Sequence, residues 1–175
     1  MAIIRSLRAS EIMDSRGDPT IEVEIETSAA KATADVPSGA SVGRHEAVEL
    51  RDQDPEVHHG KGVSKAISHI EGELRDALVG KEFDQRQLDA YLCELDGTPN
   101  KSRLGGNAIL PVSIAFVRAE ARERNIPLYQ QLATVAGTKP SLPRLLFNVL
   151  NGGKHAKGGI DIQESMIAPV GLTTI

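Results

Sequence analysis

Residues 20–27 alternate apolar and mostly acidic side chains with a period of two, reading Thr-Ile-Glu-Val-Glu-Ile-Glu-Thr. This period is typical of a β-strand with one face on a core and the other in water. An apolar segment at 3–13 precedes it, separated by a run of turn-forming residues at 14–19. A further candidate strand follows at 31–36. The sequence therefore predicts an antiparallel three-stranded meander at the start of the chain.

Helical periodicity replaces this pattern from about residue 62 to residue 136. Apolar residues recur at helical spacing from Val63 to Leu78, and Asp84 is placed to cap a second helix. A third helix is expected over about 107–124, with its charged last turns in water, and a fourth over 128–136 with Pro127 at its first position. Strands followed by helices indicate an α+β domain.

The pattern changes again after a Gly- and Pro-containing stretch at 137–143. The apolar run at 145–150 shows no alternation, which predicts a strand covered on both faces, as in an α/β barrel. Such a barrel takes typically ~250 residues. We therefore expect an α+β domain at 1–136, a linker at 137–143, and at 144–175 the first strands of an incomplete TIM-like barrel.

Composition limits the possible functions. Apolar residues make up 40% and charged residues 25%, the profile of a globular chain. The net charge of −4 disfavours nucleic-acid binding, which needs a surplus of Lys and Arg. The sequence shows neither a membrane span nor a signal peptide, so a cytoplasmic location is expected. The single cysteine, Cys93, is expected to be a buried small hydrophobe.

Two stretches carry candidate functional groups. The glycine turn at 151–153 is followed by His155 and then by the pair Gln163 and Glu164. A loop of small residues at 37–43 contains Ser41 and could let backbone approach a ligand. Taken alone, the histidine could simply cap a strand end, the glutamate could be a solvated carboxylate, and the serine a turn hydroxyl.

Together with other motifs, these stretches resemble the enolase family. The matching segments run in the expected order through the whole sequence, at 14–22, 37–41, 45–52, 60–63, 94–98, 100–102, 107–110, 151–153 and 161–164. The sequence departs from the family pattern at several positions, among them Ser10, Val42, Arg44, Pro111 and Ser165, none of which is an expected catalytic residue.

The resemblance implies an activity and a fold. Enolases reversibly dehydrate 2-phosphoglycerate to phosphoenolpyruvate in glycolysis and gluconeogenesis, with two Mg²⁺ ions at the intact site; a basic residue acting together with Mg²⁺ is a known feature of this superfamily. The substrate is a small phosphorylated acid. The resemblance further implies an N-terminal α+β capping domain, a barrel, and a homo-oligomer (dimer or higher) of the intact protein.

The resemblance also implies residue roles. Gly39, Ala40 and Ser41 would lie on the substrate-binding loop, and Ser41 would be a ligand of the second Mg²⁺. His155 would contact substrate near its phosphate and leaving group. Glu164 would act at the leaving-hydroxyl end, with Gln163 beside it as a substrate contact.

The family's general-base lysine, three metal-binding acids and a further catalytic glutamate have no positions in these 175 residues. We therefore expect the chain alone to be inactive and to represent the N-terminal part of an enolase. Two alternatives are a truncated, non-catalytic homologue acting as a binding or dimerisation module, and a related lyase that acts on another acid.

Overall fold

The computed structural model describes residues 1–39, 43–153, 156, 158–171 of the chain. The chain forms two compact units, Met1–Lys139 and Pro140–Ile175, and each is described here by itself. The assignment of 137–143 as a linker remains a prediction.

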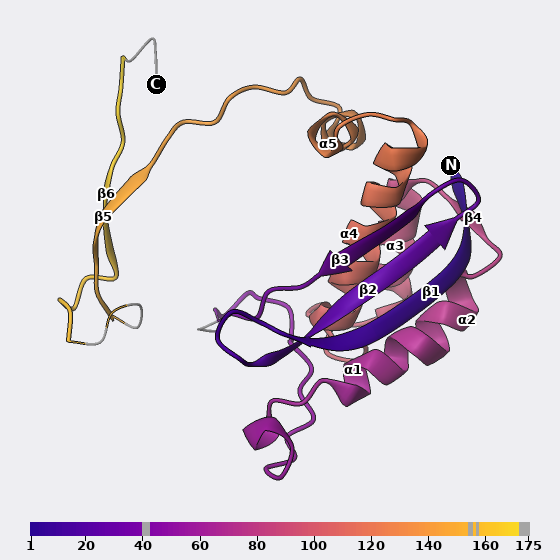
Figure 1. Ribbon diagram of the computed structural model, residues 1–175, viewed down its shortest axis with the longest axis horizontal. Helices are drawn as coiled ribbons and strands as arrows, with labels where there is room; N and C mark the ends of the chain where they lie inside the picture. Colours follow the sequence, from indigo (N-terminus) through magenta and orange to yellow (C-terminus); the bar gives the residue numbers. More distant parts are fainter. Residues whose placement is uncertain (40–42, 154–155, 157, 172–175) are drawn as a thin grey trace. The chain divides into compact units, whose positions relative to one another are not determined.

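A curved antiparallel sheet forms one layer of the first unit (Figure 1). Its strands are β1 (Ala2–Met13), β2 (Pro19–Thr27), β3 (Lys31–Asp35) and β4 (Glu82–Phe83), in the order β3-β2-β1-β4. The meander of the first three strands is as the sequence predicts. The two-residue strand β4 was not foreseen; it pairs with Ala2 and Ile3 at the start of β1.

Helices cover one face of this sheet, with α4 along β2 and β3 and with α1 and α2 beside β1 (Figure 1). The helices are α1 (Ser64–His69), α2 (Arg75–Leu78), α3 (Gln85–Asp96), α4 (Gly106–Glu123) and α5 (Leu128–Ala136), with a 3-10 turn at His58–Gly60. A π-helical turn, Ile70–Leu74, joins α1 to α2, and its Glu71 carboxylate accepts the Ala9 N–H of β1 at 2.9 Å.

The core lies between these two layers. From β2, Ile21, Val23 and Ile25 are fully buried, which is the inward face that the alternation predicts. Phe116 and Val112 of α4 are also fully buried in the same cluster. Each such side chain stabilises the fold by about 1.5–3 kcal/mol relative to leaving it in water.

Helix α3 begins at the predicted cap. The Asp84 side chain accepts the Gln87 N–H at 2.8 Å, and the Gln87 side chain accepts the Asp84 N–H at 3.0 Å. This reciprocal capping box satisfies two N–H groups that the helix itself leaves unpaired. The helix ends at Gly97, whose φ of 70° is the left-handed conformation that favours glycine.

Three expectations need correction. Cys93 is exposed, because α3 buries Leu88 and Leu92 and the next residue turns about 100° away from that face. The last turns of α4 are not uniformly in water, since Glu120 is only 2% exposed. Pro127 is the N-cap of α5 rather than its first helical residue.

The second unit is a two-stranded antiparallel hairpin of β5 (Phe147–Asn151) and β6 (Glu164–Ile167). The apolar run was expected to be covered on both faces, but Phe147, Val149 and Leu150 are 50%, 52% and 58% exposed. A two-stranded ribbon offers no second layer against which these side chains could pack.

Substitutions at two neighbouring positions of α3 test the packing of the first unit's core. We expect Leu92→Ala to lower the free energy of unfolding by about 2–5 kcal/mol, since it opens a cavity in the core. Cys93→Ala should change it by less than about 0.5 kcal/mol, as for other exposed positions. Urea denaturation followed by circular dichroism measures both. A folded protein whose Cys93 thiol fails to react with a thiol reagent would contradict the exposed placement.

Candidate functional site

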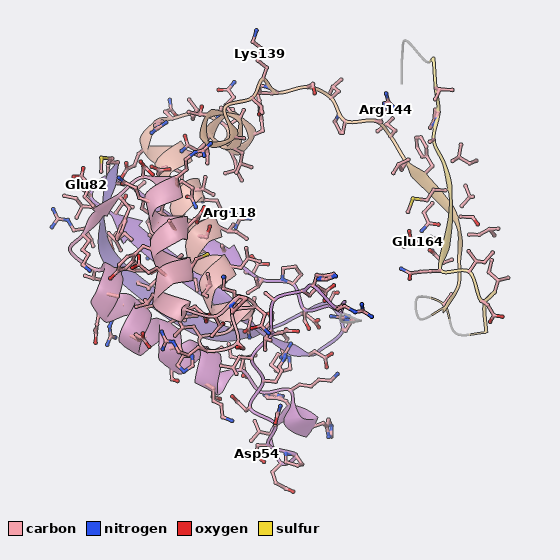
Figure 2. All side chains as sticks on the ribbon, turned by 180° about the vertical axis from the view of Figure 1, so that it is seen from behind. Asp54, Glu82, Arg118, Lys139, Arg144 and Glu164 are labelled. Atoms are coloured by element: carbon pink, nitrogen blue, oxygen red, sulfur yellow. The ribbon has the colours of Figure 1, made fainter. Side chains whose placement is uncertain are left out.

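The residues expected in the site fall in both units. Gly39 lies at the end of the described segment that follows β3, Glu164 is the first residue of β6, where Figure 2 labels it, and Gln163 immediately precedes the strand. Ala40, Ser41 and His155 lie outside the described residues. Gln163 and Glu164 are neighbours in the sequence and lie in the second unit, whereas Gly39 lies in the first.

In the first unit, the turn between β1 and β2 is built around the Asp14 carboxylate. It accepts the backbone N–H groups of Arg16 and Asp18 at 2.8 and 2.9 Å, and the Arg16 guanidinium at 3.0 and 3.1 Å. The Asp18 N–H, followed by the Arg16 groups, holds the pKa of Asp14 below its ordinary value. Arg16 is thereby aimed at the Ser38 carbonyl oxygen, to which it donates at 2.6 Å.

A second arginine, Arg51, binds the same segment through the side chain of Ser38. Arg51 donates to the Ser38 hydroxyl at 2.9 Å and to the Glu49 carboxylate at 2.5 Å. Its other terminal nitrogen donates to the carbonyl oxygens of Pro19 and Lys61, at 2.7 and 2.5 Å. Because a guanidinium is planar and carries five N–H donors, it can serve all four acceptors at once. Two arginines therefore fix the position of Ser38, the residue that precedes Gly39.

Gly39 also lines a cavity of about 890 Å³ within the first unit. Its walls are largely apolar, with Val36 and Pro37 on one side and Leu92, Cys93, Ile109 and Leu110 of α3 and α4 on another. Side chains of both charges also line it, with Glu46, Glu49 and Asp89 on the acidic side and Arg51 and Lys101 on the basic side.

In the second unit, the glycine turn sets the position of Glu164. Asn151 is opposite Glu164 in the hairpin, and the Gly152 N–H donates to the Gln163 carbonyl oxygen at 2.9 Å. A Cβ at Gly152 would overlap the carbonyl oxygens of Ile160 and Ile162, so this close approach requires glycine. Glu164 is half-buried beside this turn.

The arginine network was not recognised from the sequence. Arg16 lies in a stretch interpreted as a turn, and Arg51 in a stretch interpreted as a packed amphipathic segment. Half of their acceptors are backbone carbonyl oxygens, which every residue possesses, so the sequence carries little signal for these contacts.

No group of three or more His, Cys, Asp or Glu side chains in the described part of the chain is placed to hold a metal ion. Nor does any described helix have the length and apolar character needed to cross a membrane.

An α+β domain followed by the start of a barrel domain is the architecture that this chain presents. The chain matches the enolase N-terminal domain over residues 4–132 and the enolase C-terminal TIM barrel domain over residues 139–175. The chain belongs to the enolase family of lyases. The expected fold class is confirmed, and membership of this family in general implies a divalent metal, substrate binding and oligomerisation.

Arg51 provides a test of how the first unit holds Ser38. We expect Arg51→Ala to lower the free energy of unfolding by about 1.5–3 kcal/mol, the range for hydrogen bonds to charged groups. Arg51→Lys should lie between this variant and the parent protein, because an ammonium lacks the planar fork. Urea denaturation measures both.

The matched control is Arg75→Ala, which removes a side chain that is 47% exposed and 3.7 Å from its partner Asp76. Its effect should stay within about 0.5 kcal/mol. Equal stability of the Arg51→Lys variant and the parent protein would show that the fork geometry is unimportant.

Proposed function

We propose that this chain supplies the N-terminal part of an enolase that reversibly dehydrates 2-phosphoglycerate to phosphoenolpyruvate in glycolysis and gluconeogenesis. The observation that carries the proposal is the match to both enolase domains, consecutively and in order, along one chain. The reaction breaks the C–H bond next to the carboxylate and the C–O bond to the β-hydroxyl, and the electrons of the former become the new C=C bond.

Residues of this chain would serve the leaving-group side of that reaction. Glu164 would exchange a proton with the departing hydroxyl oxygen, which leaves as water. His155 would bind near the phosphate and the leaving group, and Gln163 would contact the substrate beside Glu164. The position of Glu164 opposite Asn151, next to a turn that admits only glycine at Gly152, supports a fixed carboxyl rather than a mobile surface group.

The loop that follows β3 would serve the other part of the reaction, away from the leaving group. Gly39 and Ala40 would approach the substrate through backbone atoms, and Ser41 would offer oxygen ligands to a second Mg²⁺. When bound, two Mg²⁺ ions would act as Lewis acids that stabilise negative charge on the substrate carboxylate. Oxygen donors suit this hard cation. The arginines that hold Ser38 support a defined starting point for this loop.

The remaining groups needed for turnover would come from outside these residues. By the family resemblance, they are a lysine base, three acidic metal ligands and a further glutamate on the barrel. We place the intact protein in the cytoplasm, as a dimer or higher homo-oligomer.

An absorbance assay for phosphoenolpyruvate tests the proposal. A polypeptide of these 175 residues should form no product with 2-phosphoglycerate and Mg²⁺, because no proton can be removed without the base. The same residues placed before an enolase barrel that carries the lysine and acidic ligands should be active and Mg²⁺-dependent.

In that longer protein, Glu164→Gln should lower kcat by about 10²–10⁴-fold, the usual contribution of a positioned acid or base. Ser165→Ala, on the same strand, should keep most of the activity. Mg²⁺-dependent turnover by the 175-residue polypeptide alone would refute the division of the site.

A further inference from the structure

Two carboxyl side chains of the first unit are equally buried but differ in their surroundings. Asp96 at the end of α3 and Glu120 in α4 are each 2% exposed. A buried carboxylate is stable only where donors replace the water it has lost. The donors around each group therefore decide whether it carries a charge in the folded protein.

Asp96 is well supplied with donors. It accepts the backbone N–H groups of Leu104 and Thr98 at 2.8 and 2.9 Å, and also the Thr98 hydroxyl. Burial alone would raise the pKa of Asp96, but these donors outweigh it, and the pKa lies below its ordinary value. Asp96 is a charged carboxylate in the folded unit.

Glu120 has a poorer set of donors. The hydrogen bond described at its carboxyl comes from Gln131 Nε2 of α5, at 2.8 Å. Burial raises the pKa of Glu120, and the more distant positive charges of Arg124 and the Met1 amino group do not cancel this effect. The negative charge of Asp84, at the start of α3, acts in the same direction as burial.

The partner of Glu120 has an unused acceptor. Gln131 is 1% exposed, and its Oε1 is buried with no hydrogen-bond partner among the residues that the structure describes. A buried carbonyl without a donor costs about 1–3 kcal/mol. A protonated Glu120 carries the O–H donor that this oxygen lacks, whereas a carboxylate can only accept.

We propose that Glu120 and Gln131 form a proton-dependent latch between α4 and α5. In the latched state the Glu120 carboxyl donates its O–H to Gln131 Oε1 and accepts from Gln131 Nε2, which satisfies both side chains with a reciprocal pair of hydrogen bonds. Loss of the proton leaves a buried negative charge with one donor and an amide oxygen with none.

The latch makes the docking of α5 dependent on pH. Apart from this pair, α5 is held near its end by Arg86, which donates to the Val135 carbonyl oxygen at 2.5 and 3.0 Å. A group whose pKa is raised on folding favours the folded state most below its ordinary value, here 4.5. Its contribution is lost as the pH rises from 4.5 through the raised pKa, and α5 is then released more easily.

Titration of the 175-residue chain tests the latch directly. The Glu120 carboxyl, followed by ¹³C NMR, should titrate with a midpoint above 4.5, and the amide signals of residues 128–136 should shift with the same midpoint. A midpoint at or below 4.5 would overturn the proposal without the need for any variant.

Variants test whether the latch makes the stability of the folded unit depend on pH. Glu120→Gln removes the titration, so the ratio of the unfolding constants of parent and variant should increase with pH, by up to tenfold per pH unit between 4.5 and the midpoint. The control Glu94→Gln, at an exposed position of α3, should give a smaller or opposite trend. A parent-to-Glu120→Gln ratio that is constant with pH would contradict the latch.

Gln131→Met tests the role of the amide. It removes the donor and acceptor while keeping an unbranched side chain of similar size, so the midpoint of Glu120 should change and the coupled shifts of residues 128–136 should disappear. An unchanged midpoint together with unchanged coupled shifts would mean that Glu120 and Gln131 are not paired in solution.

Discussion

Burial of one face of the β1–β3 meander is the constraint on which the first unit depends. The strict alternation of β2 places Ile21, Val23 and Ile25 on this face, and a shift of one residue would expose all three to water. The helices packed against this face supply the other half of the core, with α4 along β2 and β3. Arg118 of α4, labelled in Figure 2, donates to the Thr33 carbonyl oxygen of β3 at 2.7 Å and fixes the helix against the strand.

The core in turn determines where the polar network around Ser38 can form. Strands β2 and β3 pair in register up to Glu22 and Asp35, which fixes where the chain leaves the sheet. The Val36 N–H still donates to the Ile21 carbonyl oxygen at 3.1 Å, and the Thr20 hydroxyl donates to the Val36 carbonyl oxygen at 2.5 Å. Beyond this point strand pairing no longer supports the backbone; Arg16 donates to the Ser38 carbonyl oxygen and Arg51 to the Ser38 hydroxyl instead. The network thus depends on strand register as much as on the arginines.

Periodicity predicted the long elements well because it reports directly which face of an element is buried. β2 and α4 begin and end within a residue or two of their predicted bounds for this reason. The strand β4 has only two residues, too few for any period, and it exists because Ala2 and Ile3 provide a partner. The burial of Glu120 was not predicted, because a charged residue is usually expected to face water. Gln131, eleven positions later in the sequence, donates a hydrogen bond that makes this burial tolerable.

For the candidate site, the sequence predicted a loop at Gly39 and a short strand at Gln163 and Glu164. The structure has Gly39 outside any strand and begins β6 at Glu164, while Ala40, Ser41 and His155 lie outside the described residues. The roles of these residues remain predictions. Contacts such as those of Arg51 with the carbonyl oxygens of Pro19 and Lys61 depend on tertiary structure and have no local pattern.

The two compact units differ in how they bury apolar side chains. The first unit has a core of its own, with many side chains fully buried, whereas the apolar residues of the second unit remain exposed in a two-stranded ribbon. The hydrophobic effect therefore stabilises the loop-bearing unit without requiring that Glu164 be in place. The hairpin of β5 and β6 lacks such a core, and an exposed ribbon of two strands is only marginally stable. The two units are therefore stabilised differently, the first by its buried side chains and the second by the pairing of its two strands.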